Sequence, residues 1–348
     1  MSEPVHRQPP TGTDGGRPRP TIADVAQAAG VARSTVSRAL NREHRFYRSP
    51  SAARIREIAE DIGYAPDPSA ANLRRGQTNT IGVLVPRLTD TVMAMLYEEI
   101  AAASARRGYH ALVATSHDDP DLEHDNGLML LERRVDGLIL TTARTDGGFC
   151  RELAQRGVPH VLALRSFGNS AAALGDDHLG GYLATRHLLD LGHRRIALVA
   201  GPDYASSALG RRAGYQDALR EAGLPIEPTL IYPSAFSLQS GEEVGRRLLA
   251  ADPMPSAVFA VNDNTAIGLL SAVQRAGVRV PQDLSVVGYN DIPLAARLTV
   301  PLTTVRVPFA EIAAAAVDLL IDITQGVPAA TRLFAPTLIP RATTRAAS

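Results

Sequence analysis

The sequence predicts a small all-α domain near the N-terminus, followed by a much larger α/β domain with parallel sheets. The chain has 348 residues, of which 45% are hydrophobic, and this is enough for two or three domains. Residues 21–63 contain short helical patterns separated by glycine. From Thr80 onward, strand-like apolar runs alternate with helical segments, which is typical of parallel sheets with crossover helices.

All 36 cationic side chains are arginines, and they balance 36 acidic side chains. The absence of lysine excludes a Walker A phosphate loop, a Schiff-base lysine and a kinase-type catalytic lysine. The charge is unevenly distributed, because residues 17–76 hold 11 arginines and six acids. Residues 31–56 hold seven arginines and one acid, as expected for a surface that faces phosphate groups. A solvated charged face is the alternative interpretation.

The first 20 residues are rich in proline and lack an apolar core. We therefore expect residues 1–19 to be a disordered tail and not a signal peptide. No run of about 18 apolar residues occurs, so no membrane span is expected. Cys150 is the single cysteine. It cannot form a disulfide within one chain, which fits a reduced, cytoplasmic setting.

A helix-turn-helix domain is expected over residues 20–65. Thr21 and Asp24 have the spacing of a capping box, and the helix that they begin should run to Ala29. Gly30 follows and can adopt the left-handed conformation that a tight turn between helices requires.

A second helix then carries outward-facing polar residues, and a third begins at Ser49 with Pro50 in its first position and ends at Gly63. The apolar side chains that should form a shared core are Val25, Ala26, Ala29, Val31, Val36, Ala39, Leu40, Ile55, Ile58, Ala59 and Ile62. An ordinary three-helix domain is the alternative. Together with the local positive charge, the pattern favours DNA binding.

The α/β region predicts strands at IGVLV, HALVAT, VDGLILT, VPHVLAL, RRIALVA, SAVFAV and LSVVGY, with helical segments between them. We expect two sheets rather than one. Ligands of such folds bind at the carboxyl ends of the strands, and two lobes place these ends around a cleft that can close.

Enzymatic motifs are missing from this region: there is no G-x-G-x-x-G after a strand, no G-x-S-x-G and no H-E-x-x-H. Two runs, His117-Asp118-Asp119 and Asp176-Asp177-His178, contain metal-ligating residue types. Adjacent residues rarely converge on one ion, so roles in a loop or at a helix start are favoured. We expect no catalytic residue, no metal site and no cofactor.

Two segments are recognisable. TIADVAQAAGVARSTVSRALN and IGYAPDPSAANLRRGQTNTIGVLVP resemble the N-terminal signature of LacI/GalR-family transcription regulators, and the resemblance continues to about residue 341. It implies a helix-turn-helix head and an α/β two-lobed, periplasmic-binding-protein-like domain. Its two parallel-sheet, Rossmann-like lobes are joined by three crossovers, here near residues 174–178, 304–308 and 334–338.

The resemblance also implies the domain boundaries. A hinge helix and linker should occupy residues 66–78, and an effector-binding and dimerisation domain residues 79–341. The implied N-lobe spans about 79–176 and 306–336, and the implied C-lobe about 177–305 and 337–341.

DNA contacts follow from the same resemblance. The second helix would lie in the major groove, with Arg33, Ser34 and Arg38 at base edges and Thr35, Ser37 and Asn41 at phosphates. Ile22 is also expected to contact DNA. Residues 67–76 match the family's hinge helix, in which Ala70 permits close helix pairing, Leu73 inserts into the minor groove and Arg74 lies near phosphates. Two features depart from the family: Ala32 replaces a capping Ser or Thr, and the loop at 42–48 is about two residues longer.

Effector contacts implied by the resemblance are Asp90, Arg211, Asn262, Asp263, Asn290 and Phe309, with Asp291 beside them. Arg211 would bind ligand oxygens through its guanidinium fork. A helix cap or a hydrogen bond within one lobe is the alternative for each, above all for Asp263 and Asp291. Leu164 and Asn290 stand where sugar-responsive members commonly carry Asp, and Arg87 and Asp90 break the family's usual acidic and Asn pattern after VP. We therefore expect a less negative cleft and an effector that is anionic, or poorer in hydroxyls than a simple neutral sugar.

The expected function is transcriptional repression by a homodimer that binds a pseudo-palindromic operator in double-stranded DNA. Its effector would be a sugar, a sugar acid or a related metabolite in the interlobe cleft. One alternative is a solute-binding protein of the same two-lobed fold without a DNA-binding role, and another is a doubly wound enzyme. A solute-binding protein would require a signal peptide and would leave residues 21–76 unexplained.

Overall fold

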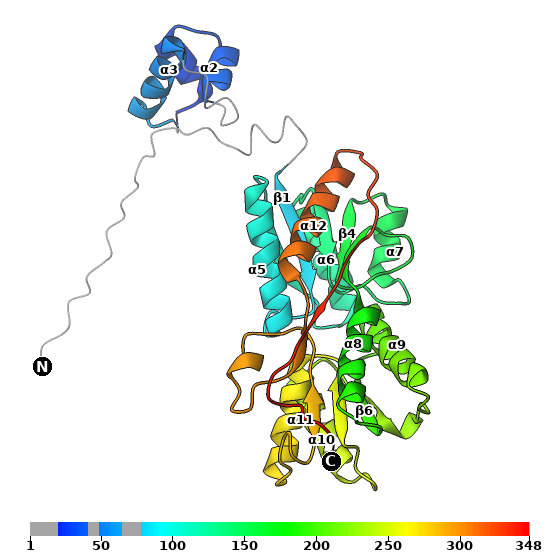
Figure 1. Cartoon of the computed structure of the whole chain (residues 1–348). Coiled ribbons are helices and arrows are strands. Elements are labelled where there is room, and N and C mark those ends of the chain that lie inside the picture. The colour runs from blue at the N-terminus through cyan, green and yellow to red at the C-terminus, as the bar shows by residue number, and fades with distance from the viewer. Residues whose placement is uncertain (1–19, 41–48, 65–77, 348) are drawn as a thin grey trace, which may run out of the picture. The chain divides into compact units, whose positions relative to one another are not determined.

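The computed structural model describes residues 20–40, 49–64 and 78–347, which belong to two compact units divided between Gly76 and Gln77 (Figure 1). The N-terminal unit contains the helices α1 (Ile22–Ala29), α2 (Arg33–Leu40) and α3 (Pro50–Asp61). The larger unit contains two lobes, each built on a parallel sheet. Among the described residues, no helix has both the length and the apolar character that a membrane crossing requires.

The first unit begins with the predicted capping box. The amide and hydroxyl of Thr21 both donate to the Asp24 carboxylate, at 2.7 and 2.8 Å, and these bonds lower the pKa of Asp24. Gly30, with φ of 66°, ends α1 in the left-handed conformation. At the start of α3 the Ser49 hydroxyl accepts from the Ala52 amide at 3.1 Å. The small core consists of Val25, Ala26, Val36, Ala39, Ala52, Ile55 and Ala59.

The first lobe has a six-stranded parallel sheet in the order β11-β5-β4-β3-β1-β2. Its strands are β1 (Thr80–Val85), β2 (His110–Thr115), β3 (Gly137–Leu140), β4 (His160–Ala163), β5 (Ala172–Gly175) and β11 (Arg332–Phe334). The helices α5 (Thr91–Arg106) and α12 (Phe309–Thr324) lie side by side on one face, and α6 (Pro120–Glu132) and α7 (Gly148–Gln155) cover the other (Figure 1). Successive β1 residues point to opposite faces, so Val83 and Val85 join the core beneath α5 and α12, whereas Leu84 joins the core beneath α6 and α7.

The second lobe has a four-stranded parallel sheet in the order β7-β6-β8-β9. Its strands are β6 (Ile196–Ala200), β7 (Ile231–Pro233), β8 (Ala257–Ala260) and β9 (Ser285–Val287). The helices are α8 (Asp177–Asp190), α9 (Ser206–Glu221), α10 (Leu238–Leu249) and α11 (Asp263–Arg275), with short 3-10 turns η2 (Pro228–Leu230) and η3 (Ala295–Arg297). A β-carbon added at Gly214 would lie 2.0 Å from the His178 carbonyl oxygen, so glycine is what allows α8 and α9 to pack so closely.

The chain crosses between the lobes three times, as the fold class predicts. It passes from β5 to α8, from β10 (Thr304–Arg306) to α12, and from β11 to β12 (Thr337–Ile339). The strands β10 and β12 pair with each other in antiparallel register. Residues beyond 341, where the resemblance places the end of the domain, also belong to the second lobe. Thr343 is buried there, and its hydroxyl donates to the Val286 carbonyl at 2.7 Å.

Candidate DNA-binding helix and effector cleft

Helix α2 divides into an apolar and a polar face. Val36 and Ala39 are buried in the small core. The side chains of Arg33, Ser34, Thr35, Ser37 and Arg38 are all exposed, as the sequence predicts. Guanidinium and hydroxyl groups are the donors that proteins use at phosphates and base edges, so this face has the chemistry of a DNA-binding surface.

The ends of α2 are held by backbone and side-chain contacts. Ala32 offers no hydroxyl cap, and the amides of Thr35 and Val36 instead bond to its carbonyl, at 2.9 and 3.2 Å. At the other end, the Nε of Arg56 on α3 donates to the Ala39 carbonyl at 3.2 Å. Ile22, another predicted DNA contact, is half-buried against the core. Asn41, Ala70, Leu73 and Arg74, together with the loop at 42–48, lie outside the described residues.

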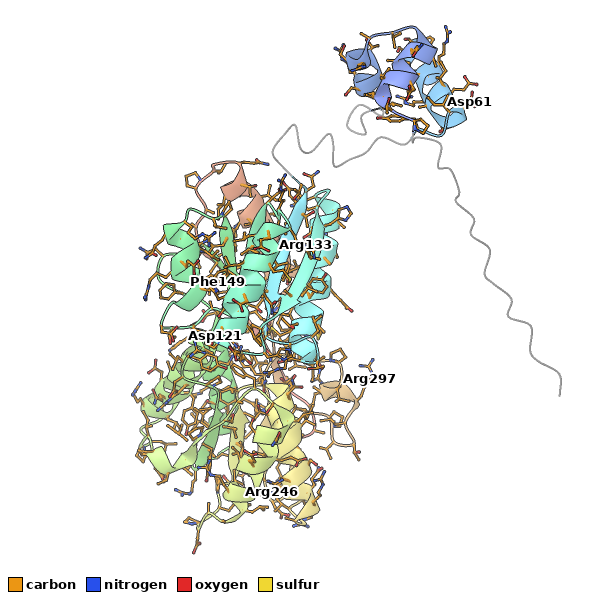
Figure 2. The ribbon with its side chains drawn as sticks, turned by 180° about the vertical axis from the view of Figure 1, so that it is seen from behind. Asp61, Asp121, Arg133, Phe149, Arg246 and Arg297 are labelled. Carbon is orange, nitrogen blue, oxygen red and sulfur yellow. The ribbon has the colours of Figure 1, made fainter. Side chains whose placement is uncertain are left out.

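A polar cavity of about 50 Å³ lies between the two lobes of the larger unit. The first lobe lines it with Arg87, Asp90, Asp118, Thr141, Leu164 and Arg165, and the second with Ser207, Arg211, Phe236, Asn262 and Asn290. Most of these residues lie within three residues of the carboxyl end of a strand, so the cavity is at the carboxyl ends of both sheets. Helix α6 shows the same polarity, since Asp121 at its start lies beside the lobe junction and Arg133 at its end lies away from it (Figure 2).

Arg211 is the most firmly held side chain of the cavity. Its Nε donates to Asp177 Oδ1 at 2.8 Å, and a terminal nitrogen donates to the Val261 carbonyl at 2.6 Å. The guanidinium carbon lies 3.8 Å from the centre of the Tyr289 ring. These contacts fix the guanidinium plane and leave its remaining edge at the cavity wall, where it can donate to a ligand oxygen.

The two predicted asparagines have different surroundings. Asn262 caps α11, because its Oδ1 accepts from the Thr265 amide at 2.8 Å and from the Thr265 hydroxyl. Asn290 is only 5% exposed and has a φ of 107°. Among the described residues its side-chain amide has no hydrogen-bond partner. Asn290 therefore presents a donor and an acceptor to the cavity.

Asp90 bonds to both lobes. Its Oδ1 accepts from the Val92 amide at 3.0 Å, which caps α5, and from Asn264 Nδ2 at 3.2 Å, which belongs to the second lobe. Burial raises the pKa of the Asp90 carboxyl.

Two predicted effector residues do not line the cavity. Both oxygens of Asp263 are used within the protein, since the Thr304 hydroxyl donates to one at 2.6 Å and the Ile292 amide to the other at 2.8 Å. Burial raises the pKa of Asp263 to about 7. Phe309 begins α12 and packs in the main apolar core. The contacts of Asp263 match the alternative interpretation, a hydrogen bond within a lobe.

The neighbouring Asp291 also has partners inside the protein. It forms ion pairs with Arg306 at 2.7 Å and with Arg341 at 2.5 Å. It is not among the residues that line the cavity.

Sequence reasoning missed Arg165, Asp118 and Phe236, all of which line the cavity. Arg165 is the second residue after the buried strand β4, and its side chain is 7% exposed. A charged residue immediately after an apolar strand is a signal that could have identified it. Phe236 lies in the loop after β7, and no local pattern marks it.

Several contacts hold the lobes together around the cavity. The Ser166 amide donates to the Ser206 hydroxyl at 2.8 Å, and the Thr145 amide donates to the Tyr204 carbonyl at 2.9 Å. The guanidinium of Arg144 stacks 4.1 Å from the centre of the Tyr204 ring. The structure therefore describes the lobes in a closed arrangement.

The two runs with metal-ligating residue types have other roles. Asp119 accepts from two amides at the start of α6, and Asp176 accepts from the Leu179 amide at the start of α8. His178 bonds to Asp217 at 2.8 Å. The helix-start interpretation is confirmed for both aspartates. In the described part of the chain, no three metal-ligating side chains come together.

A helix-turn-helix unit with an exposed polar helix, together with a two-lobed unit around a polar cavity, defines a ligand-responsive, DNA-binding regulator of transcription. Residues 21–67 match the model described as bacterial regulatory proteins, lacI family, and residues 185–344 match the periplasmic binding protein-like domain. The chain is 36% identical over 305 residues to the ribose operon repressor of Escherichia coli (strain K12), covering 86% of this chain and 92% of that protein. The chain belongs to the lacI family of bacterial regulatory proteins.

Solved structures agree with this assignment. The lac repressor dimer, bound to operator and the anti-inducer ONPF, aligns with a TM-score of 0.82 at 28% identity, over 94% of this chain and 99% of that one. A LacI family regulator from Enterococcus faecium with bound ribose gives 0.68 at 30% identity, over 77% of this chain and 100% of that one. The resemblance and the fold class are thus confirmed, and the solute-binding alternative is not favoured.

Proposed function

We propose that this chain represses transcription as a homodimer on operator DNA, and that a sugar or sugar derivative in the interlobe cavity controls the binding. One observation carries the proposal: the cavity wall is formed by the strand ends of both lobes, so one ligand can bond to both at once. The relatives named above include a ribose operon repressor, an operator-bound dimer and a ribose-bound regulator. The curated relative is a transcriptional repressor, and we assign no catalytic step to the cavity.

On the DNA side, we assign base contacts to Arg33, Ser34 and Arg38 and phosphate contacts to Thr35 and Ser37. The support is their shared exposure on α2. Asn41, Ile22, Ala70, Leu73 and Arg74 complete the proposed DNA-binding set. A two-fold dimer presents two such helices, and its operator should therefore be a pseudo-palindrome.

On the ligand side, we assign effector contacts to Arg211, Asn262 and Asn290 from the second lobe and to Asp90 from the first. Asp263 and Phe309 act as supports behind the wall. The cavity of about 50 Å³ is much smaller than the ~300 Å³ or more of typical ligand sites. A sugar-sized molecule must therefore change the spacing of the lobes as it binds, and this couples occupancy to conformation.

A gel-shift series with DNA from around the protein's own coding region tests the proposal. We expect specific binding that weakens steeply as salt rises, because arginines displace counterions from phosphates. A thermal-shift panel of sugars and sugar derivatives would identify ligands, which are then added to the gel shift. The absence of specific DNA binding at low salt would favour the solute-binding alternative and overturn the proposal.

A further inference from the structure

Arg165 is a buried cation without a close carboxylate among the described residues. Its side chain is 7% exposed, and the nearest carboxylate oxygen, on Asp118, is 3.8 Å away. Its hydrogen bond to the Thr142 carbonyl is 3.5 Å long. Arg211, by contrast, has Asp177 at 2.8 Å. Burying a guanidinium is costly unless close partners compensate its charge, so Arg165 has unused capacity to bind an anion.

The surroundings of Arg165 compensate its charge only in part: its guanidinium lies 5.6 Å from the centre of the Tyr204 ring and 5.8 Å from that of Phe236, and its ion pair with Asp118 is long and shared. Asp118 is closer to Arg87, at 3.2 Å. Asp90 bonds to Val92 and Asn264 rather than to an arginine, and burial raises its pKa.

Behind the wall, Glu123 accepts from the Thr142 hydroxyl at 2.6 Å, and burial raises its pKa as well. Of the three arginines that line the cavity, Arg211 is paired with Asp177 behind the wall, and this leaves Arg87 and Arg165 to share Asp118.

Leu164, next to Arg165, strengthens this imbalance. It lines the cavity with a φ of 63°, a left-handed conformation that is unfavourable for leucine and easier for Asn or Asp. Its amide is held by the Ala173 carbonyl at 3.0 Å. An aspartate here would suit the backbone and would supply the missing negative charge. Leucine supplies neither a charge nor a hydrogen-bond acceptor.

We propose that the effector of this protein carries an anionic group, a carboxylate or a phosphate, which binds Arg165 in the interlobe cavity beside Leu164. The guanidinium fork matches both groups, because each offers two oxygens in one plane. This inference rests on the proposed function, since it specifies the effector class of the same cavity.

Matched probes test the inference on the full chain. D-ribose, D-ribonate, D-ribose 5-phosphate and inorganic phosphate are compared by thermal shift and calorimetric titration, with sodium chloride at equal ionic strength as the blank. We expect D-ribonate or D-ribose 5-phosphate to raise the melting temperature and D-ribose to leave it unchanged. Comparison of D-ribonate with D-ribose 5-phosphate shows whether the site binds a carboxylate or a phosphate. Arg165→Met should weaken that binding by about ten-fold or more, because a charge-assisted hydrogen bond is lost.

Two controls separate the site from general charge effects. Arg246→Met removes an exposed arginine at the far end of the second lobe and should leave anion binding unchanged (Figure 2). Leu164→Asp and Leu164→Asn relieve the same backbone conformation, but only Leu164→Asp adds a negative charge. We expect Leu164→Asp to bind the anion about ten-fold more weakly than Leu164→Asn. This pair keeps the test valid if Arg165→Met does not fold.

The outcomes separate the two proposals. Equal anion affinities of Leu164→Asp and Leu164→Asn, or no response of the wild type to any anion, would overturn the inference. Stabilisation and altered operator binding by D-ribose alone would also overturn it, but would leave the proposed function standing. A chain that binds no operator specifically contradicts the proposed function, whichever probes bind.

Discussion

Asn264 on the second lobe donates from its side-chain nitrogen to the Asp90 carboxylate on the first lobe, at 3.2 Å. The two residues sit in the first turn of α11 and at the cap of α5, so the bond ties two helix starts across the cavity. With the contacts at Ser206 and Tyr204, it stabilises the closed arrangement of the lobes.

Asn264→Ala should therefore make opening of the lobes more frequent. Loss of one hydrogen bond to a partly buried carboxylate lowers the free energy of opening by about 0.5–1.5 kcal/mol. The population of the open form should therefore rise about two- to ten-fold. Hydrogen exchange measured by mass spectrometry should show faster exchange in peptides containing the Thr145 and Ser166 amides, which donate across the lobes. Peptides spanning residues 81–85 of the buried β1 are the internal control. Unchanged exchange at both amides would show that the bond does not hold the lobes closed.

Arg38→Ala should lower DNA specificity. If Arg38 contacts a base edge, its loss costs ~1–3 kcal/mol against the operator and much less against scrambled DNA. Fluorescence anisotropy with both DNAs at one salt concentration measures the ratio of the affinity for the operator to the affinity for scrambled DNA. Arg54→Ala, which removes another exposed arginine from the same unit, is the matched control and should not change this ratio. Equal specificity of Arg38→Ala and wild type would remove Arg38 from the base-contacting set.

Leu73→Ala tests a residue outside the described ranges. As a wedge in the minor groove, Leu73 should stabilise a kinked operator, and the alanine variant should bind more weakly and bend the DNA less. Energy transfer between dyes at the two ends of an operator fragment reports the bend, and anisotropy reports the affinity. An unchanged bend in the saturated complex would contradict the wedge assignment.

Asp263 should make stability depend on pH. Burial raises its pKa to about 7 in the folded state, whereas the unfolded side chain titrates near 3.8. Between these values the folded protein keeps a proton that the unfolded chain loses. The contribution of Asp263 to stability is therefore greatest below about pH 4 and falls by up to ~1.4 kcal/mol per pH unit until about pH 7.

Asp263→Asn removes this titration while keeping an acceptor for the Ile292 amide. Urea unfolding of both proteins at pH 5, 6 and 7 should give a smaller loss of stability with rising pH in the variant than in the wild type. Parallel pH profiles would show that Asp263 is already ionised throughout this range.

Local signals predicted the N-terminal helices well. Thr21, Gly30 and Ser49 make their contacts with residues only a few positions away in the chain. A local sequence pattern therefore includes both partners of each interaction. The strands β5 and β7 were not predicted, because AALG consists mostly of small residues and IYP ends in proline, so neither shows the apolar run that indicated equally short strands such as β3 and β9. Helix α12 was not predicted either, since an almost continuous apolar run does not distinguish a buried helix from a strand.

The cavity was predicted only in part, because its wall is assembled from loops far apart in sequence. Asn262 and Asp263 are adjacent, yet one lines the cavity and the other turns inward to Thr304. No local pattern distinguishes these two directions. Arg165 does have a local signal, a charge after an apolar strand, but the distance to its nearest carboxylate is revealed only by the folded chain.

The pairing of β10 with β12 limits how the lobes can move. Two of the three crossing segments are hydrogen-bonded to each other, with Thr304 opposite Ile339 and Arg306 opposite Thr337. A bonded ribbon bends more easily than it shears or separates. We therefore expect opening and closing to be mainly a rotation about the ribbon and the β5–α8 link. An effector of modest size can consequently set a single angle instead of having to order two independent bodies.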